Sequence, residues 1–183
     1  ASVGFGGSCF QKDILNLVYL CESFGLPEVA AYWQQVVTMN EYQRDRFSRI
    51  MIESMFNTVT GKRIAIFGFA FKKDTGDTRE TAAAFIVKNM LAERALCAVF
   101  DPKVEDEEMY KELGYQGMSE TSHPDLKKLV FSQKSPLDAA RGAHAIAVMT
   151  EWDEFKAYDY EELFSVMQKP AFIFDGRNIL DHS

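Results

Sequence analysis

The sequence Arg63-Ile64-Ala65-Ile66-Phe67-Gly68 is a short apolar run that ends at a glycine, and it predicts a buried strand. Comparable runs follow at residues 96–102, 145–150 and 171–175, with a weaker candidate at residues 129–131. Near-continuous apolar strands that alternate with helical segments are typical of a parallel sheet covered on both faces. The sequence therefore predicts an α/β fold built on a doubly wound parallel sheet.

Helical patterns separate these runs, at residues 80–95, 107–113, 136–141 and 158–167. The stretch from residue 105 to residue 135 is otherwise polar and irregular, and we expect a variable loop there. A doubly wound sheet binds its ligand beyond the carboxyl ends of its strands. The residues that follow each strand are therefore the first candidates for a binding site.

The segment that follows the first strand, residues 69–80, is rich in cations. Gly68 is followed by Phe-Ala-Phe, so the segment lacks the G-x-G-x-x-G fingerprint of dinucleotide binding. It carries Lys72, Lys73 and Arg79 beside a helix start, which itself favours anions. We expect phosphate to bind here, and two lysines would suit a diphosphate. The alternative is an exposed basic loop without a ligand.

Two further strand ends carry candidate residues. Asp101 could hold a ribose, but a turn that ends the strand is favoured because the glycine fingerprint is absent. Arg177 follows Asp175 and Gly176, so its side chain can project over the ligand edge of the sheet. Trp152 is expected to be a packing anchor rather than a platform for stacking.

A second candidate site lies near the start of the chain, in the octet Gly6-Gly7-Ser8-Cys9-Phe10-Gln11-Lys12-Asp13. The glycines allow the backbone to approach a ligand closely. Ser8 and Gln11 match a capping box, which would place Cys9 at the first position of a helix. At that position the free N–H groups and the helix dipole favour a thiolate.

The neighbours of Cys9 resemble the supporting groups of a nucleophile. Lys12 lies about one turn further on and adds positive charge to nearly the same face. Asp13 is close enough for its carboxylate to act on a water or a proton beside the sulfur. A cysteine at a helix start is more often an inert small hydrophobic residue. The spacing alone leaves both interpretations open.

Two long helical patterns precede the first strand, over residues 8–24 and 28–57, separated by Gly25-Leu26-Pro27. The second would span roughly 45 Å and carries more apolar residues than one short neighbour could cover. We expect it to be a spine that packs against another subunit or a further domain. Its charged residues are expected to form a solvated face or, alternatively, a subunit interface: Arg44, Asp45, Arg46 and Arg49.

Composition limits the function classes. The 183 residues carry a net charge of −7, which argues against a nucleic-acid partner. Neither a basic signal region nor an apolar run of about 20 residues is present, so we expect no membrane segment. The cysteines are odd in number and lack CxxC pairing, so neither zinc nor a disulfide framework is indicated. We expect a soluble, cytoplasmic protein and, because the chain starts without methionine, a piece of something longer.

Two long motifs carry a family resemblance: residues 3–13, around Cys9, and residues 68–80, around Lys72. Residues 32–36 and 172–177 extend it over essentially the whole chain. The chain resembles the UDP-glucose/GDP-mannose dehydrogenase family, and in particular its animal and plant members that act on UDP-glucose. Two motifs of this length in the right order make a chance match improbable.

The resemblance implies a two-step, four-electron oxidation of the C6 hydroxymethyl group of a UDP-sugar to a carboxylate, with two NAD molecules used in turn. It implies that Cys9 adds to the aldehyde, that loss of hydride gives a thioester, and that Asp13 helps water to cleave it. The residues implied to contact the substrate are Ala1, Ser2, Val3, Gly4, Phe5, Gly6, Phe71, Lys72 and Arg177. Those implied to border NAD are Cys9, Phe10, Gln11, Lys12 and Arg79.

The resemblance also implies a division of the chain and a missing partner. Residues 1–57 would hold the active-site cysteine loop and the central dimerisation helices, and residues 58–183 a Rossmann-like UDP-sugar-binding domain. Family members begin with an NAD-binding domain that this sequence does not contain. We therefore expect a homo-oligomer, either a dimer or a hexamer of dimer units, and an isolated chain without activity. The alternatives are a dehydrogenase of another sugar nucleotide, such as GDP-mannose or UDP-N-acetylhexosamine, and a non-catalytic nucleotide-binding or assembly module.

Overall fold

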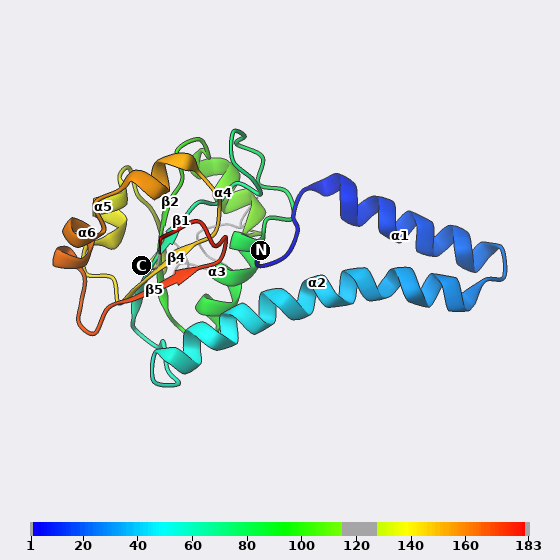
Figure 1. The fold of residues 1–183 in the computed structure, drawn as a ribbon, viewed down its shortest axis with the longest axis horizontal. Coiled ribbons are helices and arrows are strands. Elements are labelled where there is room, and N and C mark those ends of the chain that lie inside the picture. The colour runs from blue at the N-terminus through cyan, green and yellow to red at the C-terminus, as the bar shows by residue number, and fades with distance from the viewer. Residues whose placement is uncertain (1, 115–127, 182–183) are drawn as a thin grey trace.

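A computed structural model describes residues 2–114 and 128–181 of the chain. Five parallel strands form one sheet in the order β3-β2-β1-β4-β5, and a helical hairpin projects from it (Figure 1). The strands are β1 (Arg63–Phe67), β2 (Leu96–Phe100), β3 (Val130–Ser132), β4 (Ala145–Val148) and β5 (Phe172–Asp175). The expected α/β fold with a doubly wound parallel sheet is confirmed.

The strand order changes direction at β1. The chain builds β2 and β3 on one side of β1 and then returns to place β4 on the other side, where Ile66 pairs with both Val99 and Ala147. The carboxyl ends of β1 and β4 therefore flank the point at which a doubly wound sheet opens a crevice. This edge is the place where a ligand site is expected.

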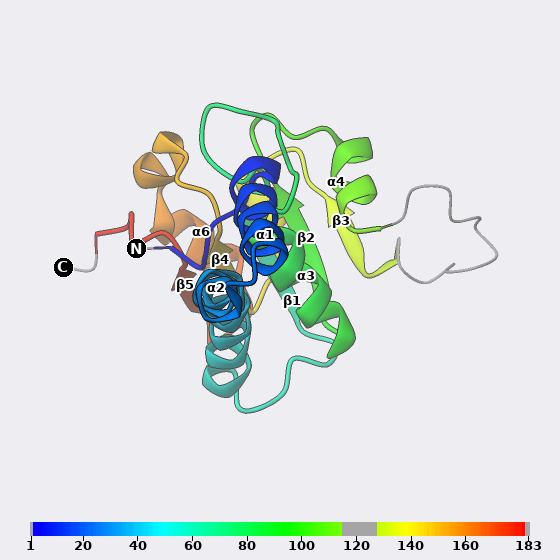
Figure 2. The same cartoon turned by 90° about the vertical axis from the view of Figure 1, so that its right-hand side faces the viewer.

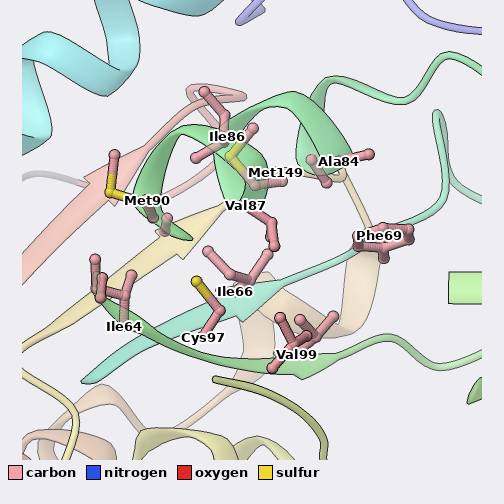
Figure 3. Packing of buried hydrophobic residues seen from close by; sticks show 14 of the residues in the cluster. Ile64, Ile66, Phe69, Ala84, Ile86, Val87, Met90, Cys97, Val99 and Met149 are labelled. Atoms are coloured by element: carbon pink, nitrogen blue, oxygen red, sulfur yellow. The ribbon is translucent and has the colours of Figure 1, made fainter. Parts of the chain in front are cut away.

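Alternate residues of β1 supply two separate cores. Ile64 and Ile66 belong to the core on the side of α3 (Ala82–Ala92), whereas Ala65 and Phe67 belong to the core on the opposite face. Figure 3 shows Val87 of α3 next to Ile66. Each fully buried aliphatic side chain of this size contributes about 1.5–3 kcal/mol, so burial on both faces stabilises the sheet.

The remaining elements cover the sheet or its edges: α4 (Asp106–Glu112), α5 (Pro136–Ala140), the 3-10 helix η2 (Asp153–Ala157) and α6 (Tyr160–Val166). The helices α4, α5 and α6 lie within a few residues of their predicted places, whereas η2 was not predicted. The prediction for α3 is wrong at its start, because Glu80 is left-handed (φ 54°) and Thr81 is the N-cap. Thr81 accepts a hydrogen bond from the Ala83 N–H, so the helix begins only after that residue.

The hairpin consists of α1 (Ser8–Ser23) and α2 (Pro27–Ser54), which lie side by side (Figure 2). The 28-residue α2 ends earlier than predicted, because Phe56 and Asn57 are left-handed (φ 66° and 57°). Only a small buried cluster joins the two helices: Val18, Cys21 and Ala30. Across the described ranges, the helices are nowhere both long and apolar enough to cross a membrane.

Candidate active site

The two sequence motifs meet at the carboxyl edge of the sheet. The Gly7 N–H donates a hydrogen bond to the Arg79 carbonyl, with N and O 2.9 Å apart. A Cβ on Gly6 would lie 2.7 Å from the Glu80 carbonyl oxygen, and a Cβ on Gly7 would lie 3.1 Å from the Phe71 ring. Side chains at these two positions would therefore push the segment that leads into Cys9, residues 2–7 (the cysteine loop), away from the loop that follows β1.

Ser2 and Val3, which precede these glycines, contact residues at the end of β5. Val3 is buried, and a Cβ on Gly176 would lie only 2.6 Å from the Val3 Cγ2 atom. Ser2 Oγ accepts a hydrogen bond of 2.7 Å from Arg177 Nη1. The segment 2–7 thus runs between the end of β5 and the loop that follows β1. Ala1, which was expected to contact substrate, lies outside the described residues.

Cys9 is exposed in the first turn of α1, but it is not the first helical residue. The predicted capping box is wrong, because Gly7 is the N-cap (φ 87°) and no side chain caps the helix. Gly7 lies beside the Phe71 ring, and Ser8 is the first residue of the helix. Cys9 still lies among the N–H groups that an α-helix leaves unpaired at its start.

Arg79 is a cation that interacts electrostatically with Cys9. The Asp77 carboxylate, hydrogen-bonded to the Arg79 guanidinium, raises the pKa of Arg79, and Cys9 adds a smaller electrostatic contribution. Phe10 is exposed and its ring lies edge-on to Phe5, with 4.7 Å between centroids. Gln11 is half-buried.

Lys12 and Asp13 follow on α1, and both side chains are exposed. Neither forms an ion pair with another described residue. They are therefore accessible to solvent and to a ligand that approaches the first turn of the helix.

The three cations of the loop after β1 differ in their surroundings. Lys73 Nζ lies 2.7 Å from Asp153 Oδ2, and Arg79 Nη2 lies 2.6 Å from Asp77 Oδ2. Lys72 has no such carboxylate partner in the described parts of the chain, and its Nζ lies 5.4 Å from the Phe71 ring centroid. Lys72 is consequently the lysine of this pair that can bind an anion without breaking an ion pair.

Asp101 shapes the backbone of this loop. Its carboxylate accepts hydrogen bonds of 2.7–3.2 Å from five donors: the N–H groups of Phe69, Ala70, Lys103 and Val104, and Nε1 of Trp152. The favoured interpretation of Asp101 as a turn residue is confirmed, and Trp152 is buried as expected. A carboxylate with five donors has little capacity left for a ribose.

Arg177 lies at the same edge, with its side chain largely buried. Its Nε donates to the Met149 carbonyl (2.7 Å) and lies 3.0 Å from Glu151 Oε2, and its Nη2 donates to the Phe71 carbonyl (2.7 Å). Burial lowers the pKa of Arg177, and the charge of Glu151 acts in the opposite direction. Arg177 thus joins the ends of β4 and β5 to the backbone of Phe71. It also lies at the edge of the sheet where a ligand is expected.

Two residues of α2 that the sequence did not single out also hold the site. Asn40 exchanges hydrogen bonds with the backbone of Phe5, accepting from its N–H at 2.7 Å and donating to its carbonyl at 3.2 Å. Arg44 donates from Nη2 to the Phe5 carbonyl (2.7 Å) and to the Glu80 carbonyl (3.2 Å). The prediction that Arg44 belongs to a solvated face is wrong, because its side chain is 1% exposed. Asn40, Arg44 and Ser48 are polar residues four positions apart on α2. This spacing was the signal in the sequence that could have placed them on one face of the helix.

Family models match both parts of the chain. The UDP binding domain of the UDP-glucose/GDP-mannose dehydrogenase family matches residues 65–182, and the central domain of the same family matches residues 1–42. Both motifs that meet at the site lie wholly or largely within the matched ranges.

Individual relatives agree. The chain is 58% identical to a UDP-glucose 6-dehydrogenase of Drosophila melanogaster, over 100% of this chain and 38% of the relative. It is 58% identical to that of Pongo abelii, over 99% of this chain and 36% of the relative. The solved UDP-glucose dehydrogenase of Pyrobaculum islandicum superposes with a TM-score of 0.74 at 27% identity, over 98% of this chain and 36% of that one.

The chain thus spans little more than a third of the length of these relatives. Both motifs fall within the ranges that the family models match, as do the sheet apart from the first two residues of β1 and the hairpin up to residue 42. On this evidence the chain belongs to the UDP-glucose/GDP-mannose dehydrogenase family.

Proposed function

We propose that this chain supplies the thiol and the sugar-nucleotide site of an NAD-dependent UDP-glucose 6-dehydrogenase, which oxidises UDP-glucose to UDP-glucuronate. The observation that carries the proposal is the meeting of two loops at the carboxyl edge of a parallel sheet. One loop presents an exposed thiol, Cys9, and the other presents Lys72, which has no carboxylate partner among residues 2–114 and 128–181. The relatives named UDP-glucose 6-dehydrogenase match across the whole of both loops.

Each loop has a distinct proposed role. The Cys9 sulfur forms a covalent bond to C6 of the sugar at the aldehyde stage, beside the N–H groups that the first turn of α1 leaves unpaired. Asp13, exposed on the next turn, orients the water that later cleaves the thioester and releases the thiol. Lys72 binds the diphosphate. The other proposed substrate contacts are Ala1, Ser2, Val3, Gly4, Phe5, Gly6, Phe71 and Arg177.

NAD fits this chain only at the border of the site. At the end of β2, where a dinucleotide fold would hold a ribose, the Asp101 carboxylate already accepts hydrogen bonds from five donors. The exposed first turn of α1 and the exposed Arg79 side chain offer a surface that NAD can contact. When bound, NAD accepts hydride from the sugar carbon. The proposed bordering residues are Cys9, Phe10, Gln11, Lys12 and Arg79.

This division predicts that the 183-residue chain alone forms no NADH from UDP-glucose. We propose residues 1–57 as the cysteine loop with its central helices and residues 58–183 as the UDP-sugar-binding domain. Calorimetric titration of the chain should show binding of UDP in preference to GDP. A preference for GDP would instead favour a GDP-sugar dehydrogenase, and NADH formation by the isolated chain would contradict the division.

The main test is Cys9→Ser in the full-length protein. We expect the rate of UDP-glucuronate formation to fall by about 10³-fold or more, because the hydroxyl is a far weaker nucleophile than a thiolate. Ser8→Ala, which alters the adjacent residue in the same turn, is the matched control and should retain most of the activity. Unchanged oxidation in Cys9→Ser would rule out the thiol mechanism.

We also propose that α2 pairs with a second copy of the chain. Val29, Tyr32, Val36 and Met39 recur at spacings of three and four, and three of them are exposed by 42–68%. Tyr32, Val36 and Met39 line an open groove of about 460 Å³ that continues to Gly4 and Phe5 of the cysteine loop. Apolar residues at this spacing are typical of helices that pack against another helix. Light scattering of the full-length protein should therefore report a dimer or a multiple of it.

A cytoplasmic location is the last part of the proposal. All three cysteines are free thiols, one of them exposed. Free exposed thiols are typical of a reducing compartment. Microscopy of the fluorescently tagged full-length protein is the direct measurement.

A further inference from the structure

Arg44 is a buried cation without a carboxylate partner among the described residues. Its side chain is 1% exposed, and burial lowers its pKa, which the more distant charges of Glu80 and Glu41 only partly offset. A buried guanidinium is unfavourable unless its surroundings compensate for the lost water. The groups that replace water around the Arg44 guanidinium therefore indicate its role.

The compensation comes from two backbone carbonyls and an aromatic ring. One nitrogen, Nη2, donates both to the Phe5 carbonyl (2.7 Å) and to the Glu80 carbonyl (3.2 Å). The guanidinium carbon lies 3.8 Å from the centroid of the Phe85 ring, a favourable cation–π distance. The Nε atom has no hydrogen-bond partner. The two carbonyls are therefore the only groups that Arg44 binds by hydrogen bonds in the described structure.

The two carbonyls belong to different parts of the site. Phe5 lies in the segment that leads into Cys9, and Glu80 ends the loop that contains Lys72. Phe5 is held at its backbone N–H and carbonyl by Asn40. Glu80 is held on its other side, because its N–H donates to Glu112 Oε1 at 3.0 Å. Arg44 thus joins two segments that are each fixed independently.

We propose that Arg44 is a positioning residue that sets the distance between the Cys9 sulfur and the sugar nucleotide held by the loop after β1. The proposal rests on the function proposed above. A single nitrogen that draws both carbonyls together fixes the spacing of the two loops. A misplacement of about 1 Å at a reacting atom can lower the rate by about 10²-fold without a comparable change in ground-state binding.

The test compares Arg44→Met and Arg44→Lys with Arg49→Met, an exposed arginine on the same helix, in the full-length protein. We expect Arg44→Met to lower kcat by about 30- to 100-fold, with the KM for UDP-glucose changed by less than about threefold. Arg44→Lys retains a donor but not the planar guanidinium, so it should recover about tenfold of that loss. Arg49→Met should behave like the unsubstituted protein.

A second measurement separates positioning from folding. UDP-glucose should protect Cys9 from alkylation by iodoacetamide in the unsubstituted protein, and this protection should fall in Arg44→Met even when UDP-glucose is saturating. UDP affinity, measured by calorimetry, should stay within about threefold, because the Lys72 loop is intact. If Arg44→Met does not fold, Asn40→Ala releases Phe5 while keeping Arg44, and it should show the same pattern to a smaller extent.

Three outcomes would overturn the proposal: an unchanged kcat in Arg44→Met, full protection of Cys9 in that variant, or a fall in kcat matched by an equal fall in UDP affinity and melting temperature. The function proposed above would fail in a different way. If the unsubstituted protein neither oxidises UDP-glucose nor shows protection of Cys9, the failure lies with that function rather than with Arg44.

Discussion

The sheet and the helical hairpin bury their apolar residues to very different extents. Every residue of β1 from Ile64 to Phe67 is fully buried, with one core on each face of the sheet. On the hairpin, Phe24 is 76% exposed and Tyr32 is 68% exposed. The centre of the sheet is therefore covered on both faces by this chain, whereas the hairpin presents surfaces suited to another chain or segment.

The candidate site lies where these two regions join. The cysteine loop leaves the hairpin and is held by Asn40 and Arg44 of α2 on one side and by Arg177 and Gly176 of the sheet on the other. The sheet and α2 thus hold the reactive segment together. The hairpin provides the exposed surfaces through which the rest of an enzyme can reach the site.

The largest effect should come from the sheet core. Ile66→Ala removes a fully buried side chain between β1 and α3, and we expect it to lower the free energy of unfolding by about 3–4 kcal/mol. Phe24→Ala removes a larger side chain from the tip of the hairpin and should change it by less than about 0.5 kcal/mol. Urea unfolding followed by circular dichroism measures both, and similar losses would break the contrast.

Removal of the Asp101 carboxylate should come next. Asp101→Ala leaves five donors without their acceptor, and we expect a loss of about 2–3 kcal/mol in the free energy of unfolding. Asp153→Ala also deletes a carboxylate with two lysine partners, but at an exposed site. It should cost less than about 1 kcal/mol. Equal melting temperatures for the two variants would show that Asp101 does not organise the loop.

A change on the hairpin should affect association rather than folding. Met39→Glu places a charge in the apolar groove of α2 and should raise the dissociation constant of the oligomer by about tenfold or more, which is about 1.4 kcal/mol. Thr38→Glu, at the neighbouring exposed position outside the groove, is the control. Analytical ultracentrifugation measures both. Dissociation by Thr38→Glu alone would place the contact on another face of α2.

The smallest effect is a dependence of stability on alkaline pH. Burial raises the pKa of the Cys97 thiol to about 12, from 9.0 for an unperturbed thiol. Above pH 9 the unfolded chain loses this proton and the folded chain keeps it, so stability falls as pH rises, by about 1 kcal/mol at pH 10. Cys97→Ala should remove this slope, whereas Val99→Ala, a buried neighbour without a titratable group, should retain it.

The elements that could be predicted from the sequence are those fixed by local pattern. The strands followed from runs such as Ile64 to Phe67, and the two loops of the site followed from the glycines, Cys9 and the lysines. Asp101 could be assigned to a turn because the sequence lacked a glycine fingerprint beside it. Local residue types were sufficient in each case.

The parts that could not be predicted depend on contacts between distant segments. The partners of Arg44 are backbone carbonyls 36 and 39 residues away, and a carbonyl has no side-chain signature. The predicted capping box failed because Gly7 is the N-cap, in a loop whose backbone bonds to the distant residue Arg79, so that Ser8 lies inside the helix. Lys73 could not be separated from Lys72 because its partner, Asp153, is 80 residues away.

The attachment of Ser2 and Val3 beside Gly176 and Arg177 has a consequence for biosynthesis. The Ser2–Arg177 hydrogen bond joins residues 175 positions apart. A ribosome releases the chain from its N-terminal end, so the segment before Cys9 emerges early, while its attachment site at the end of β5 emerges late. Until residue 177 has left the exit tunnel, Ser2 and Val3 lack this attachment, and, among the described contacts, only those of Phe5 and Gly7 with α2 and Arg79 can hold the segment before Cys9. The attachment of the segment before Cys9 is therefore completed only after all five strands of the sheet have been synthesised.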